Sequence, residues 1–446
     1  MTKDMTTGHP LRLILFFTLP VMIGNIFQQF YNMADAVIVG RYLGADALAA
    51  VGAVGSLMFL TQGFANGVAQ GFGVAVSHAF GAKDYKLLKH YVAVSIMLMV
   101  IVSAIITIPT VMFCEELLLF INMPANIIQM AEDYLIIILA GIICNMAYNA
   151  SAGILRGIGD SKTPLFFLIF SSVLNIFLDI YMIVTLNLGT AGAAYATVIA
   201  QGISALLCFI YMFGKFEILR TGLEDYYLDR ASVKKMLFIG VPMAVNYSVT
   251  ALGLTVMQSA VNMFGSVAVA GYTAASKVYL LAMQVPASFG VTMATYCGQN
   301  LGAKSYDRIF RGVRYAFFLS FLIAAVESVA SVWCGPLAVR LFIDQPSPEI
   351  VSYAMEYLKL VSWFYVPLTW IFIYRNTLQG LDKGFIPMLS GLLEFFARYF
   401  TVTWFAGRFG YKAVCFGDPA TWITTSFLLM VTYYLWVWKM KKTQIK

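Results

Sequence analysis

Residues 16–44 read FFTLPVMIGNIFQQFYNMADAVIVGRYLG, and the rest of the chain is interpreted from this stretch. Its apolar part is long enough to cross a bilayer, which takes about 20 helical residues. On a helix its polar side chains form a single stripe, because they recur at steps of three and four residues. A charged residue in the centre of the bilayer costs about 2.5–3.5 kcal/mol, so we expect this stripe to face protein or a water-filled cavity. The stripe consists of Asn25, Gln28, Gln29, Asn32 and Asp35.

The composition excludes an ordinary soluble protein. Of 446 residues, 60% are hydrophobic and 11% are charged, and the mean hydropathy is +0.79. Soluble domains carry about 25% charged residues. The net charge of +7 does not indicate nucleic-acid binding, because the basic residues lie in short loops between apolar runs. The chain is therefore expected to cross a bilayer many times.

Twelve apolar stretches are expected to be helices, since open strands leave backbone groups unpaired in lipid. An even number places both termini on one side. The termini and alternate loops hold 21 Lys and Arg residues and the opposite loops hold four, so we expect both termini in the cytoplasm. The expected spans are residues 13–39, 47–76, 91–113, 127–153, 165–186, 191–213, 236–264, 267–298, 313–334, 351–378, 385–406 and 419–438.

The two halves of the chain repeat. The sequence GAKDY at residues 81–85 recurs as GAKSY at residues 302–306, and LRG at 155–157 recurs as LQG at 378–380. Such offsets of 221–223 positions predict two lobes of the same topology around a central cleft, as in many carriers that work by alternating access. We assign residues 1–213 to an N-terminal lobe of six helices, 214–235 to a cytoplasmic linker and 236–446 to a C-terminal lobe of six helices.

A second acid is expected to join Asp35. Helix five carries Asn175 and Asp179, four residues apart and hence on one face. Two carboxylates in one low-dielectric site cannot both ionise cheaply, so one would load and release a proton; the same oxygens could hold a monovalent cation. Asn149 and Thr197 either belong to this site or form ordinary hydrogen bonds between helices.

The second half is not a copy at these positions. Met257 stands where the first half has Asp35, and Glu394 and Arg398 are spaced for an ion pair within one helix. We therefore expect the coupling chemistry in the first half. Three other embedded charges have no assigned role: Lys277, Glu327 and Arg375.

Helix two combines small residues with amides. Gly63, Gly67 and Gly71 have the spacing that allows two helices to approach closely. The amides beside them are candidates for lining a substrate cleft, which the many aromatic and methionine residues would suit to amphiphilic cations. The cleft candidates are Asn25, Gln28, Asn32, Gln62, Asn66 and Gln70.

Several other functions lack the residues that they need. The turn GIGD at residues 157–160 lacks the GxxxxGK[ST] frame of a phosphate loop, so ATP is not expected to drive transport. The six cysteines form no CxxC pair, and the three histidines form no catalytic or metal-binding group. We expect no enzyme activity, no cofactor, no metal centre and no nucleic-acid partner.

Over essentially its whole length the chain resembles the multidrug and toxic compound extrusion (MATE) transporters. The resemblance rests on the duplication and on five motifs: Pro20, NMAD at 32–35, GAK at 81–83, LRGIGDSKTP at 155–164 and NIFLD at 175–179. It implies twelve helices in two halves and antiport, in which a drug-like molecule leaves as H⁺ or Na⁺ enters.

The resemblance also implies roles for individual residues. In the bacterial branch with coupling acids in the first half, the helix-one proline matching Pro20 is implicated in bending, which fits the physical effect of proline in a helix. The other main branch keeps an acid in helix seven, and this chain departs from it at Met257. The implied coupling network is Asp35, Asn149, Asn175, Asp179 and Thr197.

The sequence thus predicts a monomeric, multi-pass antiporter of the bacterial plasma membrane that exports organic, often cationic, amphiphilic compounds. We favour H⁺ as the coupling ion because paired acids titrate without an ordered coordination shell, although Na⁺ at Asp35 and Asp179 remains an alternative. A flippase for a lipid-linked precursor is the alternative function. It would need a strongly basic cleft for a pyrophosphate, and the embedded cations are few.

Overall fold

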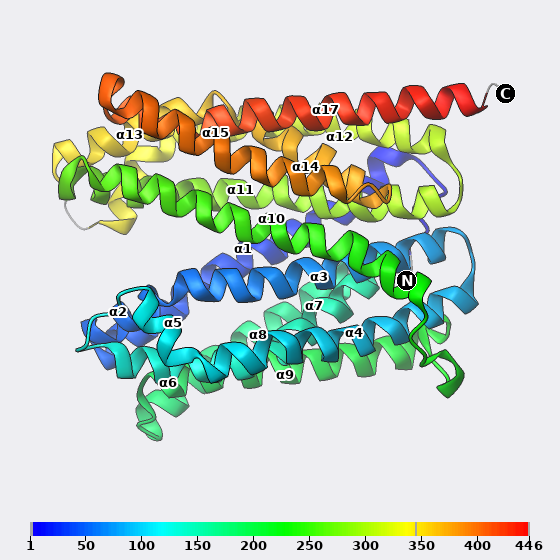
Figure 1. Ribbon diagram of the computed structural model, residues 1–446, viewed down its shortest axis with the longest axis horizontal. Coiled ribbons are helices and arrows are strands. Elements are labelled where there is room, and N and C mark those ends of the chain that lie inside the picture. The colour runs from blue at the N-terminus through cyan, green and yellow to red at the C-terminus, as the bar shows by residue number, and fades with distance from the viewer. Residues whose placement is uncertain (1–2, 344–345, 445–446) are drawn as a thin grey trace. The chain divides into compact units, whose positions relative to one another are not determined.

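The computed structural model describes residues 3–343 and 346–444, which are mostly helical (Figure 1). In this part of the chain nine helices are long and apolar enough to cross a membrane, and three bent helix pairs raise the number of spans to as many as twelve. The prediction of an all-helical membrane protein is confirmed. The nine helices are α1 (Pro10–Leu43), α4 (Tyr85–Met112), α8 (Lys162–Ile180), α9 (Gly189–Lys215), α10 (Arg230–Asn262), α11 (Gly265–Gly302), α12 (Tyr306–Phe342), α15 (Phe385–Phe409) and α17 (Gly417–Gln444).

Three predicted spans are broken into two helices each. The bends are 42° between α2 (Ala45–Ala53) and α3 (Gly55–Gly81), 44° between α6 (Ile128–Ala140) and α7 (Ile142–Gly157), and 54° between α13 (Pro348–Ser362) and α14 (Tyr365–Gly380). The sequence did not predict these breaks. The remaining short elements are α5 (Cys114–Phe120), a π-helical turn (Tyr181–Thr185), two 3₁₀ turns (Glu217–Leu219 and Leu223–Asp225) and α16 (Tyr411–Cys415).

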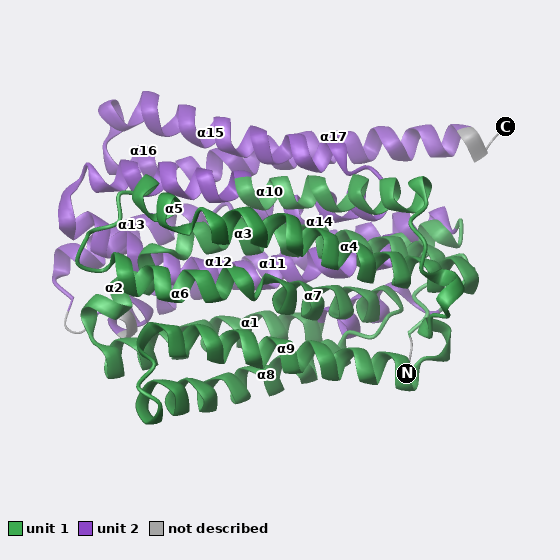
Figure 2. Ribbon diagram, turned by 60° about the horizontal axis from the view of Figure 1, so that its bottom comes forward, with its two compact units in different colours: residues 1–7, 19–248, 298–304 green, residues 8–18, 249–297, 305–446 purple. Residues whose placement is uncertain are grey.

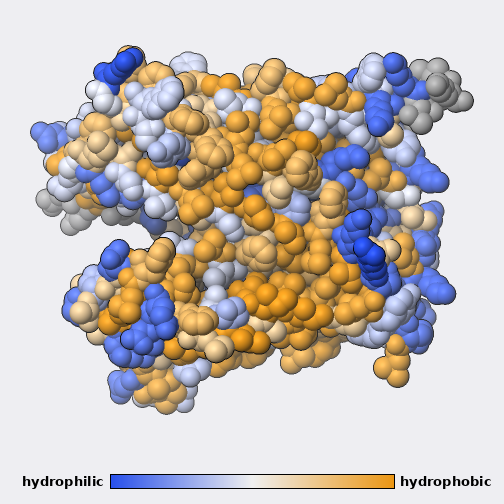
Figure 3. All heavy atoms as spheres, in the orientation of Figure 1, coloured by the Kyte–Doolittle hydropathy of each residue, from blue (hydrophilic) through white to orange (hydrophobic). Residues whose placement is uncertain are grey.

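The surface of the helices matches a bilayer environment. Figure 3 shows hydrophobic residues over the middle of the helices and hydrophilic residues gathered at their ends. Large apolar side chains in the middle of helices are widely exposed, including Ile105 at 64% and Val326 at 68%. Contiguous apolar surface of this kind is stable against lipid and not against water.

The described chain forms two compact units (Figure 2). Unit 1 comprises Met1–Thr7, Leu19–Ser248 and Gly298–Lys304, and unit 2 comprises Gly8–Thr18, Val249–Cys297 and Ser305–Lys446. Helix α1 passes from one unit to the other directly before Pro20. The two lobes that we assigned in the sequence were defined by the repeat, whereas these units are defined by compactness. The two divisions therefore differ, and the lobe boundaries stay a prediction.

Glycines set the distance between α3 and α10 inside unit 1. A Cβ atom on Gly67 would lie 2.4 Å from the backbone nitrogen of Ala244, and one on Gly71 would lie 2.5 Å from the backbone of Gly240. Any larger side chain would therefore push the two backbones apart. The predicted packing role of the glycines at four-residue spacing is confirmed.

The two copies of the GAK sequence meet each other, also inside unit 1. A Cβ atom on Gly81 would lie 1.9 Å from the carbonyl oxygen of Gln299, and one on Gly302 would lie 2.1 Å from that of His78. The contact is reciprocal, because Gly302 and Gln299 each lie 221 positions after their counterparts Gly81 and His78. It joins the end of α3 to the end of α11.

The segment that leads into α10 is held by a small polar group. Asp229 accepts a hydrogen bond from the backbone N–H of Ser232 at 2.8 Å and so caps the helix. The same carboxylate lies 3.0 Å from Nε2 of His90 on α4, whose Nδ1 lies 3.0 Å from the carbonyl oxygen of Asp225. The ring of Tyr227 stacks on His90 at 4.2 Å between centroids. Hydrogen bonds from Ser232, together with His90, lower the pKa of Asp229 to about 2.

The glycine contact has a mutational test. Gly81→Ala should lower the free energy of unfolding by about 1–3 kcal/mol, because the new methyl group overlaps a backbone oxygen that cannot turn away. Gly214→Ala, in α9, is the matched control: no atom lies within 4 Å of its Cβ position, and the change should be neutral or slightly stabilising. Thermal unfolding in detergent measures both. Equal melting temperatures for the two variants would contradict the close contact.

The helix cap at Asp229 predicts a pH dependence. A carboxyl whose pKa is lowered on folding stabilises the native state above its unfolded pKa of 3.8, and this stabilisation is lost as the pH falls through about 2. Asp229→Ala should thus cost about 1 kcal/mol at pH 7. The difference in melting temperature from the unmodified protein should shrink between pH 4 and pH 2. A difference that stays constant over this range would show that the carboxylate charge has no part in the cap.

Candidate functional site

The two acids expected to couple transport meet inside unit 1. The carboxyl groups of Asp35 on α1 and Asp179 on α8 lie close enough to interact directly. Two buried carboxylates this close repel each other when both are ionised, so the pair favours a shared proton or a bound cation. Asp179 is fully buried, whereas Asp35 is partly exposed. The pair can therefore hold one proton between an enclosed oxygen and a more accessible one.

An amide and a hydroxyl complete the group around Asp179. With the Asn175 amide in the orientation that satisfies its neighbours, its nitrogen donates to Oδ2 of Asp179 at 2.8 Å. Its oxygen then accepts from the backbone N–H of Thr197 at 3.1 Å and from the Thr197 hydroxyl at 3.3 Å. Asn175 and Thr197 are 1% and 8% exposed. The structure thus brings together Asp35, Asn175, Asp179 and Thr197.

The local fold explains why these side chains converge. Asn175 and Asp179 lie one turn apart on α8, which packs along α9 and so faces Thr197. On α1, Gly24 lies against Leu165 and Leu168 of α8, with its Cβ position 3.4–3.5 Å from their methyl groups. The π-helical turn begins two residues after Asp179, and single π-turns recur at functional sites in other proteins.

Two tyrosines belong to this group and were not predicted. Tyr31, one turn before Asp35 on α1, lies beside Thr197. Tyr134 on α6 is 3% exposed and interacts electrostatically with Tyr31 and both acids. The four-residue spacing from Asp35 could have identified Tyr31. Nothing in the sequence around Tyr134 distinguishes it from other tyrosines in the spans.

Each acid also has an oxygen that is not satisfied. Within residues 3–343 and 346–444, the buried Oδ1 atoms of Asp35 and of Asp179 have no hydrogen-bond partner. A buried acceptor without a donor is costly, by about 1–3 kcal/mol. Such oxygens favour the arrival of a proton or a cation, so the pair is suited to reversible ion binding.

The structure places the other predicted site residues in varied surroundings. Asn149 donates to the backbone oxygen of Asn145 at 2.9 Å, on its own helix α7, so no described bond connects it to the acids. Gln70 donates to the hydroxyl of Tyr247 at 2.9 Å. The buried Oδ1 of Asn66 has no hydrogen-bond partner among the described residues. Asn25, Gln28 and Gln62 are partly exposed, and Asn32 is exposed.

Unit 2 contains buried ion pairs that differ from the predicted one. The expected pair within α15, between Glu394 and Arg398, is wrong. Glu394 instead pairs with Arg375 on α14, and Arg398 pairs with Asp418 at 2.8 Å. Asp418 also accepts from the hydroxyl of Tyr357 at 2.8 Å. Helix packing places these partners on neighbouring helices, which a reading of one helix at a time could not show.

The two remaining embedded charges of the second half still have no role. Lys277 on α11 is partly exposed. Glu327 on α12 has a buried Oε1 without a hydrogen-bond partner within the described ranges. Glu327 lies in unit 2 and the acid pair lies in unit 1.

The sequence model of the MatE family matches residues 20–181 and again residues 242–403. The second match begins and ends 222 positions after the first, which agrees with the repeat found in the sequence. Together the two matches cover more than half of the chain. The chain belongs to the MatE family. It is therefore a multi-pass membrane transporter with two repeated halves, and not an enzyme.

Similar proteins span almost the same length. The probable multidrug resistance protein YpnP of Bacillus subtilis is 27% identical over 444 residues, which are 98% of each chain. The probable multidrug resistance protein NorM of Thermotoga maritima is 25% identical over 381 residues, 84% of this chain and 81% of NorM. The crystal structure of a MATE protein in complex with MaL6 matches with a TM-score of 0.92 at 23% identity, covering 99% of this chain and 100% of that one. The MATE fold is thereby established.

Breaking the buried ion pair between Arg398 and Asp418 should destabilise the protein strongly. Asp418→Ala should lower the free energy of unfolding by about 3–5 kcal/mol, because it leaves the buried Arg398 guanidinium without a counter-charge. The double variant Arg398→Met/Asp418→Leu removes both charges and should cost clearly less. Thermal unfolding in detergent compares the two. A double variant that is as unstable as the single one would indicate that volume, and not charge, decides stability here.

Proposed function

We propose that this MATE transporter is a multidrug efflux antiporter, which exports organic, often cationic, amphiphilic compounds in exchange for H⁺. The names of its relatives YpnP and NorM support a drug-like substrate. The proximity of the Asp35 and Asp179 carboxyl groups supports H⁺ as the coupling ion, because a proton on one of them removes the repulsion between two buried charges. Na⁺ bound to the same oxygens is the alternative, distinguished by experiment below.

The coupling site is the group of Asp35, Asn175, Asp179 and Thr197, with Tyr31 added. In this proposal Asn175 and Thr197 hold the Asp179 side chain in place, and Asp35 exchanges the proton with water because it is partly exposed. We also include Asn149 in the coupling site, and we propose that its side chain approaches the acids in another conformation of the transporter. This last role is supported by the family resemblance and by no described hydrogen bond.

Protonation would be transmitted through α1, which carries Asp35 and Tyr31. Neutralising Asp35 changes its interaction with Asp179, and α1 would adjust by bending at Pro20, where the missing backbone N–H weakens the helix. Transport follows only if ion and substrate bind the two conformations with different affinity. We propose that the protonated state releases the substrate on the outer side.

The substrate path would be lined by amides of α1 and α3. Asn25, Gln28 and Gln62 are partly exposed and Asn32 is exposed, so each is open to a ligand. Gln70 and Asn66 complete the set, although Gln70 is held by Tyr247 in this structure. The protein would work as a monomer in a bacterial plasma membrane, with both termini in the cytoplasm as the loop charges indicate.

The acid pair can be tested in liposomes that contain the purified protein and a fluorescent organic cation. A pH gradient should drive dye movement, and Asp35→Asn or Asp179→Asn should slow it at least about tenfold, because coupling requires a group that changes charge. Glu327→Gln, which also removes an embedded acid, is the matched control and should retain most of the rate.

The outcomes separate the alternatives. Dye movement that depends on a Na⁺ gradient and does not respond to a pH gradient would indicate that the same residues bind Na⁺. Asp35→Asn and Asp179→Asn proteins that still accumulate dye against its gradient would show that the coupling site is elsewhere. Failure of both gradients with a panel of dyes would favour the flippase function, and lipid-linked precursors would then be assayed.

A further inference from the structure

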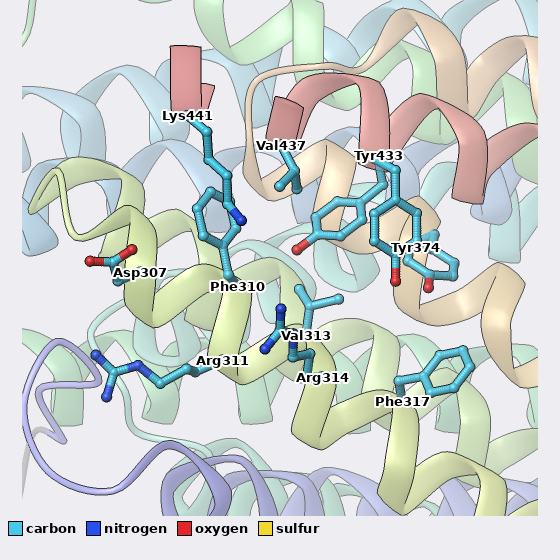
Figure 4. A pocket seen from close by; sticks show the side chains of 11 residues that line it. Asp307, Phe310, Arg311, Val313, Arg314, Phe317, Tyr374, Tyr433, Val437 and Lys441 are labelled. Carbon is cyan, nitrogen blue, oxygen red and sulfur yellow. The ribbon is translucent and has the colours of Figure 1, made fainter. Parts of the chain in front are cut away.

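Unit 2 contains a pocket at the end where α12 begins and α17 ends (Figure 4). Its volume is about 330 Å³. Arg311 and Arg314 line it from the first turns of α12, and Lys441 lines it from the last turn of α17. The acid in its lining is Asp307, so the formal charge of the lining is positive.

The positive charges of this pocket are not paired with any carboxylate among the described residues. Within the described ranges, Arg311, Arg314 and Lys441 have no carboxylate oxygen within 4.0 Å; the ion pairs between described residues join other side chains. The Lys441 ammonium lies 5.9 Å from the centre of the Phe310 ring, which attracts a cation without neutralising it. Clustered cations of this kind attract an anion.

The rest of the lining is aromatic. Tyr374 on α14 and Tyr433 on α17 are buried, with ring centres 5.4 Å apart, and Tyr434 and Phe317 stand beside them. Figure 4 shows the tyrosines on one side of the space and the cations on the other. An occupant therefore needs an anionic group together with an apolar or hydroxyl-bearing part.

The surroundings place the pocket at the level of lipid headgroups. Both α12 and α17 are candidate membrane spans, and the pocket lies within two to three turns of their ends. Tyr434, Leu435 and Trp438 are 55–61% exposed on α17, and Lys442 lies 4.0 Å from the Trp438 ring centre. Exposed aromatic residues followed by lysines are typical of a membrane–water interface.

We propose that this pocket binds the headgroup of an anionic phospholipid. Arg314 and Lys441 contact the phosphate, since a guanidinium offers two parallel donors and an ammonium offers a point charge. Arg311 raises the local positive potential. The tyrosines receive the glycerol part through their hydroxyl groups, and the acyl chains continue along the exposed apolar surface of α17. Basic pockets between spanning helices bind anionic lipid headgroups in this manner.

The test uses delipidated full-length protein in detergent, titrated with phosphatidylglycerol or with phosphatidylcholine and followed by native mass spectrometry. Phosphatidylglycerol should be retained in preference to phosphatidylcholine. Arg314→Gln/Lys441→Gln should weaken its retention about tenfold or more, because two charge-assisted contacts are lost. Lys83→Gln/Lys442→Gln removes the same charge outside the pocket and should change retention less than twofold.

Other outcomes would overturn the proposal. Equal weakening in both double variants, or equal retention of the two lipids, would show that no site for an anionic headgroup exists here. Inorganic phosphate that displaces phosphatidylglycerol at equal concentration would identify a soluble anion as the ligand. If the double variant fails to fold, Arg314→Lys keeps the charge and loses the two-donor contact; it should weaken retention about threefold, and unchanged retention would contradict the assigned role of Arg314.

Discussion

The Asp35 and Asp179 carboxyl groups lie beside each other in a part of unit 1 with little access to water, where neither could remain ionised and unpaired at low cost. The surrounding side chains are arranged to suit this acid pair. Asn175 donates to the enclosed acid and accepts from Thr197, so the amide fixes one carboxyl group while the other keeps an exposed side. The two acids thus differ in their access to the surroundings: Asp179 is enclosed and Asp35 is partly exposed.

Close helix contacts provide the rigid frame that this arrangement needs. Gly67 and Gly71 on α3 face the backbone of α10, and Gly73 and Gly157 bring α3 and α7 into similar contact. With so little space between backbones, these helices have few alternative packings. Unit 1 therefore holds its buried polar group on a firm scaffold, while α1, which carries Asp35 and Pro20, has its first residues in unit 2 and the rest in unit 1.

Periodicity and charge were sufficient to predict much of this molecule. The stripe containing Asp35 and the four-residue spacing of Asn175 and Asp179 are local patterns, so the acids could be paired from the sequence. Partners from distant helices could not be found in this way. Tyr134 and the Arg398–Asp418 pair depend on which helices become neighbours, and Asp418 sits at the start of α17 in a segment that resembled a loop. The helix bends could not be predicted either. At the break between α6 and α7, Gly141 lies directly against Val198 of α9, and such a contact between distant segments has no local pattern in the sequence.

The reciprocal contact of Gly81 and Gly302 bears on the origin of the chain. Each glycine touches the residue equivalent to the one that its counterpart touches, which is the signature of an isologous interface between two identical subunits. A shorter ancestor that carried one GAK loop would have formed the same contact with a second copy of itself. Fusing two such copies would turn the homodimer interface into an internal one. Fused halves are free to diverge, and in this chain the first half has Asp35 at the position where the second has Met257.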